Sequence, residues 1–387
     1  MACKAKGAHA IVIYFDAAAT SFLKPDTVQS AMKEALETMS SVGRGAYPPA
    51  LAAARTVLHC REQLANLFGL SDPARVCFTQ NATEALNTAI FGLLNPEDHI
   101  ITTAMEHNSV LRPLYYLEEM GAQLTILPTD AQGGIDLRDF ETALRPNTKA
   151  VVCTHASNVT GNVLDLERIG AFCRGHGLLF VVDAAQSAGT LEIDMVWQGI
   201  SVLCFSGHKG LFGPQGTGGL CVAPEVFVRP LKVGGSGIDS FDRYQPFEYP
   251  EALEAGTLNV HGIAGLSAGL EFIHRVGLYA IHERENMLAQ RFYTGISGLS
   301  GVTIYGDWNT PLRTAIVAMN IEGEDADVVS DVLAERYGIC TRAGAHCAPL
   351  MHDALGTDSL VRFSFSYFNT EDEVDTAIGA VRELVGA

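Results

Sequence analysis

Apolar and polar positions follow two different periods along the chain. Short, nearly continuous apolar runs, typical of strands, fall at 75–79, 99–103, 123–127, 150–154, 178–182 and 200–205. Segments with the helical period lie among them, at 48–67, 82–93, 109–120, 136–144 and 166–176. Strands that are apolar on both sides are expected where helices cover both faces of a sheet. The alternation therefore predicts an α/β fold with a mostly parallel sheet.

The rhythm changes near residue 256. Two long helical stretches, 260–275 and 278–296, precede a region of strands and helices that continues to the C-terminus. We therefore expect a large domain over 21–255 and a smaller C-terminal α/β domain over 256–387.

Composition limits the classes of protein to which the chain can belong. Its 387 residues are 48% hydrophobic and 18% charged, which is enough for two domains with substantial cores. The formal net charge of -18 disfavours nucleic acid as a partner. The apolar run 10–15 is too short to cross a membrane.

The nine cysteines are scattered at irregular spacing, without CxxC pairs or the spacing of a zinc site. This pattern predicts no metal centre and no disulfide scaffold, and favours a reducing compartment, by default the cytoplasm. Cys77, Cys153, Cys204 and Cys221 lie in apolar runs and are expected in the core.

Polar residues that follow the strands suggest a site for pyridoxal phosphate (PLP). Such a site needs a lysine for the imine, an acid for the pyridine nitrogen, an anion cup, a group on the ring face and a carboxylate-binding arginine. Lys209 follows the run 200–205 and a Ser-Gly-His turn, and Asp183 ends the run 178–182, with Gln186 just beyond. Asp183 then lies at the carboxyl end of a parallel strand, where ligands bind. Taken alone, Lys209 is equally a surface lysine and Asp183 a helix cap.

An anion cup is predicted at 79–84, where a strand turns into a helix whose free N–H groups favour a phosphate. Ser206 and His208 would add side-chain donors. The spacing of Asn81 and Glu84 equally fits a capping box. His107 follows another strand and could stack on the pyridine ring. The glycine-rich runs 213–219 and 234–237 are expected to shape turns.

These motifs together resemble the class V aminotransferase-fold enzymes of PLP fold type I, and within them the cysteine desulfurase and selenocysteine lyase branch. The resemblance rests first on Asp183-Ala184-Ala185-Gln186 and on Ser206-Gly207-His208-Lys209, with Lys209 26 positions after Asp183. Further matches along nearly the whole chain are Asp16-Ala17-Ala18-Ala19-Thr20, Arg44-Gly45, Glu106-His107, Ala156-Ser157-Asn158, Glu254-Ala255-Gly256-Thr257-Leu258-Asn259, Arg342-Ala343-Gly344-Ala345-His346-Cys347-Ala348 and Val361-Arg362.

The resemblance implies a role for each matched residue. Lys209 would carry the cofactor as a Schiff base, with Asp183 at the pyridinium, Gln186 at the ring hydroxyl, His107 as stacking base, and Asn158 at the ring hydroxyl or the substrate. The phosphate would be held by Ala82, Thr83, Ser206 and His208, and by Thr257 from the second subunit of a homodimer. The substrate carboxylate would bind Arg362. Cys347 would be the nucleophile, its thiolate favoured by His346 or by Arg342 at the substrate site.

The implied reaction converts L-cysteine to L-alanine and leaves a persulfide on Cys347 for a sulfur-acceptor protein, as in iron–sulfur cluster assembly. The pattern around Cys347 resembles the Suf-type group, and residues 1–20 would pack on the small domain. Three alternatives stay open: a selenocysteine lyase or cysteine-sulfinate desulfinase, a class V aminotransferase or epimerase acting on a related amino acid, and a non-catalytic assembly subunit.

Overall fold

The computed structural model describes residues 12–43 and 45–386, and a seven-stranded sheet forms the centre of this part of the chain. The strands are β2 (Val76–Thr79), β3 (His99–Thr103), β4 (Gln123–Leu127), β5 (Thr148–Thr154), β6 (Leu179–Asp183), β7 (Val202–Ser206) and β8 (Gly218–Val222), in the order β2-β8-β7-β6-β5-β3-β4. Neighbours from β4 to β7 are parallel, whereas β8 is antiparallel to both β2 and β7. The predicted mostly parallel sheet is confirmed.

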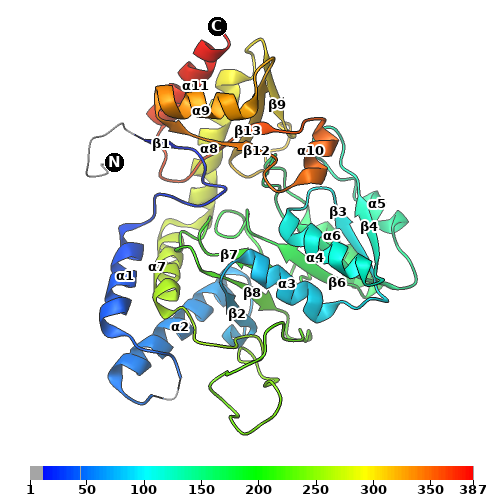
Figure 1. Ribbon diagram of the computed structural model, residues 1–387, viewed down its shortest axis with the longest axis vertical. Coiled ribbons are helices and arrows are strands. Elements are labelled where there is room, and N and C mark those ends of the chain that lie inside the picture. Colours follow the sequence, from blue (N-terminus) through cyan, green and yellow to red (C-terminus); the bar gives the residue numbers. More distant parts are fainter. Residues whose placement is uncertain (1–11, 44, 387) are drawn as a thin grey trace.

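Helices cover both faces of this sheet (Figure 1). They are α1 (Asp26–Thr38), α2 (Pro48–Leu67), α3 (Ala82–Leu93), α4 (Asn108–Glu119), α5 (Arg138–Thr142), α6 (Leu166–His176) and α7 (Val260–Val276). Successive residues of β5 enter different cores, Val151 and Cys153 in one and Ala150 and Val152 in the other. This explains why the strands are apolar at consecutive positions.

A second, four-stranded sheet lies beside the first, in the order β12-β13-β10-β9. Its strands are β9 (Val302–Tyr305), β10 (Ile316–Ile321), β12 (Arg342–Gly344) and β13 (Leu360–Ser364), all paired antiparallel. Around it lie α8 (Leu278–Ile296), α9 (Ala326–Tyr337), α10 (Pro349–Leu355) and α11 (Glu371–Leu384). Phe292 of α8 and Phe363 of β13 belong to the separate core of this region.

The N-terminal segment joins the two regions. β1 (Ile13–Tyr14) pairs in parallel with β11 (Ile339–Cys340), next to the small sheet. A few residues later, the Ser21 N–H donates to the His208 carbonyl oxygen at 2.9 Å, on the large-sheet side. Residues 1–11 of the expected 1–20 segment lie outside the described residues.

The expected domain boundary at residue 256 stays a prediction. The packing of α7 favours a boundary after this helix, between α7 and α8. α7 packs on α1 and α2. Its residues Ile263 and Leu266 belong to the core of the large sheet, whereas Leu288 of α8 belongs to the small-domain core.

The structure differs from the sequence predictions in three elements. The helix expected at 136–144 covers only Arg138–Thr142, and α1 and β8 were not predicted. The glycines of β8 suggested a turn, but they allow a close approach between strands. A Cβ on Gly218 would lie 2.7 Å from the Cα of Asn81, and one on Gly219 would lie 2.6 Å from the Cys77 carbonyl oxygen.

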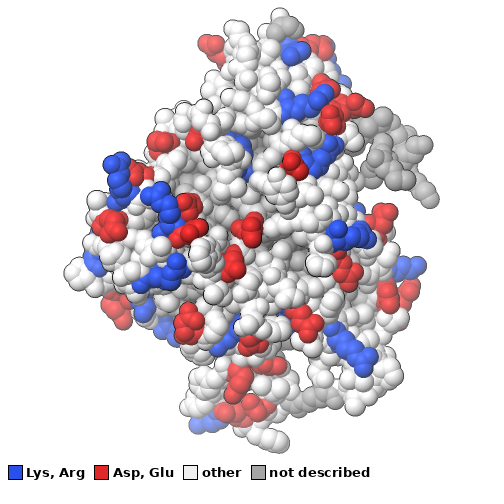
Figure 2. Space-filling view, turned by 180° about the vertical axis from the view of Figure 1, so that it is seen from behind, with Lys and Arg blue, Asp and Glu red and all other residues white. Residues whose placement is uncertain are grey.

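Basic and acidic side chains are interspersed on the face shown in Figure 2. The excess of acidic residues is therefore not gathered there into one patch. Among the described helices, none is both long and apolar enough to span a membrane.

Candidate active site

A cavity of about 220 Å³ brings together residues from both sheets. The region of the seven-stranded sheet contributes the carboxyl ends of β5, β6 and β7 and the starts of α3 and α4, and the region of the four-stranded sheet contributes β12, β13 and the loop after β12. Of the residues predicted from sequence, those that line it are Ala82, Thr83, His107, Asn158, Asp183, Gln186, Ser206, His208, Lys209, Arg342, His346, Cys347 and Arg362.

Lys209 follows β7, where its ammonium form is poorly solvated. Burial lowers the pKa of Lys209 to about 8, and the nearby Arg362 and Arg342 act in the same direction. The Asp183 carboxylate opposes this shift. Lys209 is therefore still mainly an ammonium at pH 7, but its fraction of free amine, the form that attacks a carbonyl, is far larger than that of an ordinary lysine.

Asp183 ends β6 and is buried at the floor of the cavity. Its Oδ1 accepts a hydrogen bond from the Ala185 N–H at 2.9 Å, which leaves the second oxygen for a cationic group. Burial raises the pKa of Asp183, while the Ala185 N–H and Lys209 lower it. A positive ring nitrogen would stabilise the carboxylate here.

His107 caps the start of α4, and this contact determines its tautomer. Its Nδ1 accepts from the Ser109 N–H at 3.0 Å, so the neutral ring carries its proton on Nε2. Burial, followed by the Lys209 charge, lowers the pKa of His107 to about 4. His107 is therefore neutral at pH 7.

The predicted anion cup lies at the start of α3, on the wall of the cavity. The Ala82 N–H donates to Ser206 Oγ at 3.4 Å, and Thr83 Oγ1 lies 2.9 Å from Ser109 Oγ. Asn81 also caps the helix, since its Oδ1 accepts from the Glu84 N–H at 2.9 Å. The Glu84 carboxylate accepts from the Gln80 N–H at 2.7 Å, so Asn81 caps the helix without the reciprocal bond of a capping box, and the anion-binding role of this turn stays a prediction.

Arg362, on β13, is 2% exposed, and two of its three guanidinium nitrogens have hydrogen-bond partners. Its Nη1 donates to the Asn158 carbonyl oxygen at 2.9 Å, and its Nη2 donates to Asp16 Oδ1 at 2.8 Å. Its Nε has no partner in the described structure. A buried N–H without an acceptor fits an anionic ligand such as a carboxylate.

Cys347 lies in the loop between β12 and α10, and it is exposed as well as lining the cavity. Burial lowers the pKa of the neighbouring His346 to about 3. His346 is therefore uncharged at neutral pH, and of the two residues expected to favour a thiolate, Arg342 is the cation. Cys77, Cys153, Cys204 and Cys221 are buried, as expected.

Two contacts near the site were missed. Asp16 was noticed only as part of a motif, because its pairing with Arg362 joins residues that are 346 positions apart. Glu106 is fully buried, and burial raises its pKa to about 8. It accepts from Thr103 Oγ1 at 2.5 Å and from the Thr154 N–H at 3.0 Å. An acid directly before His107 was the available signal.

Thr257 is exposed and is not part of the cavity of its own chain. Arg44 of the Arg44-Gly45 match lies outside the described residues.

The polar groups that line the cavity fit PLP: an amine at Lys209, a buried acid at Asp183, a neutral ring at His107 and helix-start donors at Ala82 and Thr83.

Comparison with known proteins agrees with this chemistry. The family model for aminotransferase class V matches residues 13–376. A probable cysteine desulfurase of Methanothermobacter thermautotrophicus is 34% identical over 97% of this chain and 95% of its own, and the cysteine desulfurase IscS of Pectobacterium carotovorum is 33% identical over 97% and 93%.

Solved structures agree as well. An apo cysteine desulfurase from Thermococcus onnurineus has a TM-score of 0.92 and 37% identity, over 97% of this chain and 95% of that one. The cysteine desulfurase CsdA of Escherichia coli has a TM-score of 0.88 and 30% identity, with the same coverage.

Proposed function

Since the chain belongs to the class V aminotransferase family of PLP-dependent enzymes, and its relatives are cysteine desulfurases, we propose that it releases sulfur from L-cysteine. The products are L-alanine and a persulfide on Cys347. The observation that carries this proposal is one cavity lined by Lys209, Arg362 and an exposed Cys347. An aminotransferase needs the first two residues but not the cysteine.

Substrate binding is assigned to Arg362 and Arg342. Arg362 offers its unpaired Nε to the substrate carboxylate, while its contacts with Asp16 and Asn158 hold the guanidinium in place. Arg342 lies opposite Arg362 in the register of β12 and β13 and lines the same cavity. Two cations on one wall favour an anionic substrate over a neutral amine.

PLP, when bound, supplies an electron sink for the bonds next to the substrate α-carbon. Lys209 is its expected attachment point, with Asp183 at the ring nitrogen. The proton from the substrate α-carbon is taken by Lys209 Nζ, because burial favours the free amine. His107, neutral with its proton on Nε2, lines the same cavity as the proposed stacking group, and its Nε2–H is a hydrogen-bond donor.

Cys347 receives the sulfur. Its thiolate attacks the substrate sulfur, a sulfur–sulfur bond forms, and the carbon–sulfur bond breaks with its electron pair staying on carbon. Protonation of that carbon completes alanine, so no external oxidant or reductant is needed. A sulfur-acceptor protein then regenerates Cys347, and iron–sulfur cluster assembly is the proposed destination, since some relatives are IscS proteins.

We also propose a homodimer with shared active sites. The long loop between β8 and α7, which projects from the body in Figure 1, exposes a run of large apolar side chains: Val233, Phe241, Tyr244 and Phe247. Such a surface is expected to be covered. Beyond it, Glu254 forms a buried ion pair with Arg61, at 2.5 Å, which fixes the segment that leads to the exposed Thr257. Thr257 is then available to the partner's cofactor phosphate.

A reducing compartment such as the cytoplasm remains the proposed location. It is supported by the cysteines of the described chain, all of which are free thiols.

Alanine formation tests the proposal. The purified protein with PLP should form alanine from L-cysteine, and Cys347→Ser should reduce the rate by at least about 100-fold, as loss of a nucleophile does. Full activity of Cys347→Ser would contradict the role of Cys347. Rates with L-selenocysteine and L-cysteine sulfinate test whether the protein is instead a selenocysteine lyase or a cysteine-sulfinate desulfinase. Neither of these reactions depends on the cysteine nucleophile as strongly as desulfuration of L-cysteine does. Amino transfer without sulfur release would show a class V aminotransferase instead.

A further inference from the structure

The backbone of the Cys347 loop is strained at two consecutive residues. His346 and Cys347 have φ angles of 51° and 56°, in the left-handed region that disfavours residues with a Cβ. Neither is glycine, and Gly344 nearby also has a positive φ. Such a conformation persists only where surrounding contacts hold it, and it is often found at functional sites.

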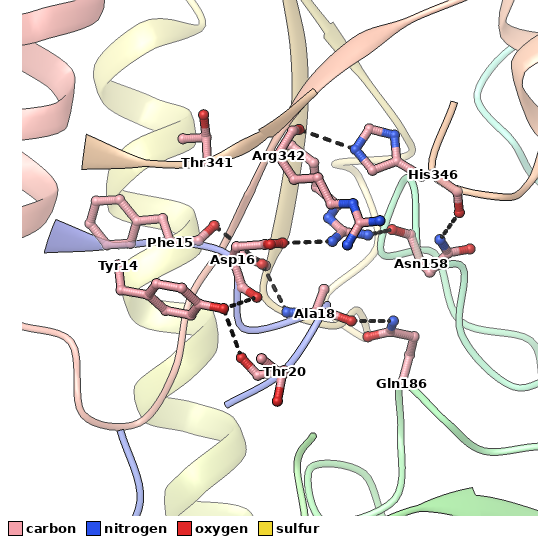
Figure 3. A network of polar contacts seen from close by, with 12 residues as sticks. Tyr14, Phe15, Asp16, Ala18, Thr20, Asn158, Gln186, Thr341, Arg342 and His346 are labelled. Carbon is pink, nitrogen blue, oxygen red and sulfur yellow. Dashed lines mark hydrogen bonds and ion pairs between the residues drawn. The ribbon is translucent and has the colours of Figure 1, made fainter. Parts of the chain in front are cut away.

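Two hydrogen bonds hold the carbonyl groups of these residues. Asn158 Nδ2 donates to the His346 carbonyl oxygen at 2.8 Å (Figure 3), and the Asn108 N–H donates to the Cys347 carbonyl oxygen at 2.7 Å. The second donor is a backbone group that α4 places near the loop. The first comes from a side chain and therefore depends on the identity of residue 158.

Asn158 is bound at both of its ends. Its own carbonyl oxygen accepts from Arg362 Nη1 at 2.9 Å, while its side chain contacts the loop. Asn158 and Arg362 are both buried. Arg362 is held from its other side by Asp16 Oδ1, at 2.8 Å. A continuous chain of hydrogen bonds thus runs from the proposed carboxylate-binding arginine to the cysteine loop (Figure 3).

We propose that Asn158 is a positioning residue for Cys347, which clamps the strained loop at a fixed distance from Arg362. This inference rests on the proposed function in one respect: it assumes that Arg362 binds the substrate carboxylate and that Cys347 takes the sulfur. The clamp then holds Cys347 in a set position relative to the bound substrate carboxylate. Without it, the loop relaxes toward ordinary φ values and Cys347 moves away from the substrate sulfur.

The chain offers a matched control in the same turn. Asn162 is buried like Asn158, but its Nδ2 donates to the Gln132 carbonyl oxygen at 2.7 Å, away from the cysteine loop. Asn162→Asp and Asn158→Asp change one amide to a carboxyl of the same shape. If general loosening of this turn were enough to release the Cys347 loop, both variants would release it.

Hydrogen exchange of the holoenzyme without substrate is the deciding measurement. In Asn158→Asp, amides of the segment 343–350 should exchange about five-fold faster than in the wild type, the factor expected for one lost buried hydrogen bond. Asn162→Asp should leave that segment unchanged. The proposal would be overturned if the amides of 343–350 exchanged in Asn158→Asp at the wild-type rate. It would also be overturned if exchange of this segment were accelerated equally in both variants. Because this readout needs no turnover, it stands even if the proposed reaction is wrong.

Kinetics give a second readout. Asn158→Asp should lower kcat for alanine formation by a larger factor than it raises KM for L-cysteine, because Arg362 is kept while the attack by Cys347 is misplaced. Asn162→Asp should keep both constants. A rise in KM with kcat unchanged would assign Asn158 to substrate binding rather than to positioning of Cys347.

Discussion

At the scale of single residues, the site depends on buried groups whose charge is shifted by burial and neighbours. Burial brings the pKa of Lys209 down to about 8, and burial followed by the Lys209 charge brings that of His107 down to about 4. Arg362 stays positively charged, although burial lowers its pKa, because the ion pair with Asp16 opposes the shift. A lysine with a lowered pKa, a neutral imidazole and a fixed cation thus share one cavity.

Arg362→Lys tests the carboxylate site. Lysine keeps the positive charge, but its single ammonium cannot replace three guanidinium nitrogens that contact Asn158, Asp16 and the substrate carboxylate in fixed directions. We expect KM for L-cysteine to rise by about ten-fold or more, as when a charge-assisted hydrogen bond is lost. Arg138→Lys, at an exposed position on α5, is the control. An unchanged KM in Arg362→Lys would place the substrate carboxylate elsewhere.

The residues of this site were partly predictable from sequence. Lys209, Asp183 and His107 each follow a strand, and the carboxyl ends of parallel strands converge. The pairing of Asp16 with Arg362 and the clamp of Asn158 on His346 were not predictable, because they join segments 346 and 188 positions apart. No local pattern encodes such contacts.

At the scale of elements, α8 links the two regions and carries a buried acid. Glu285 Oε1 accepts from the Tyr367 N–H at 3.0 Å, which ties α8 to the turn before α11. Burial raises the pKa of Glu285 to about 8. The amphipathic period predicted α8 almost to the residue, whereas β8 was missed because its glycines serve a close approach to Asn81 rather than a turn.

Glu285 should make the stability of the fold depend on pH. Its pKa is higher in the folded than in the unfolded chain, so the folded state holds the extra proton. Its contribution to the free energy of unfolding is therefore greatest below about pH 4.5 and is lost as pH rises toward about 8. Glu285→Gln keeps the acceptor for Tyr367 and removes the titration.

Chemical denaturation at pH 5 and pH 8 measures this effect. The wild type should lose more unfolding free energy between the two values than Glu285→Gln, by up to about 1.4 kcal/mol for each unit of pKa shift. Glu283→Gln, at an exposed position two residues before Glu285 on α8, serves as control. An equal loss in the wild type and in Glu285→Gln would show that Glu285 is ionised in the folded protein.

At the scale of the whole molecule, the described chain leaves an apolar surface uncovered and Thr257 away from its own cavity. Composition and hydrophobic period predicted the layers of the fold, because both follow from burial. They could not predict which surfaces meet another chain, since exposed apolar residues such as Phe241 look in sequence like core residues.

Changing the loop surface tests the homodimer. Phe241→Asp combined with Phe247→Asp should shift the molecular mass in solution from dimer to monomer, because it places charges in an apolar interface. Trp197→Asp removes an aromatic that is 65% exposed elsewhere on the surface, and it should leave the dimer intact. A monomeric wild type, or a double variant that stays dimeric, would contradict this assignment of the interface.

The central claim, that Cys347 accepts the sulfur of L-cysteine, is tested most directly by the mass of the peptide that carries it. After brief exposure of the holoenzyme to L-cysteine and alkylation of free thiols, that peptide should gain the mass of one additional sulfur atom. The gain should be absent in Cys347→Ser and absent from the peptide of the partly exposed Cys340. Alanine production with no added sulfur on Cys347 would contradict the account.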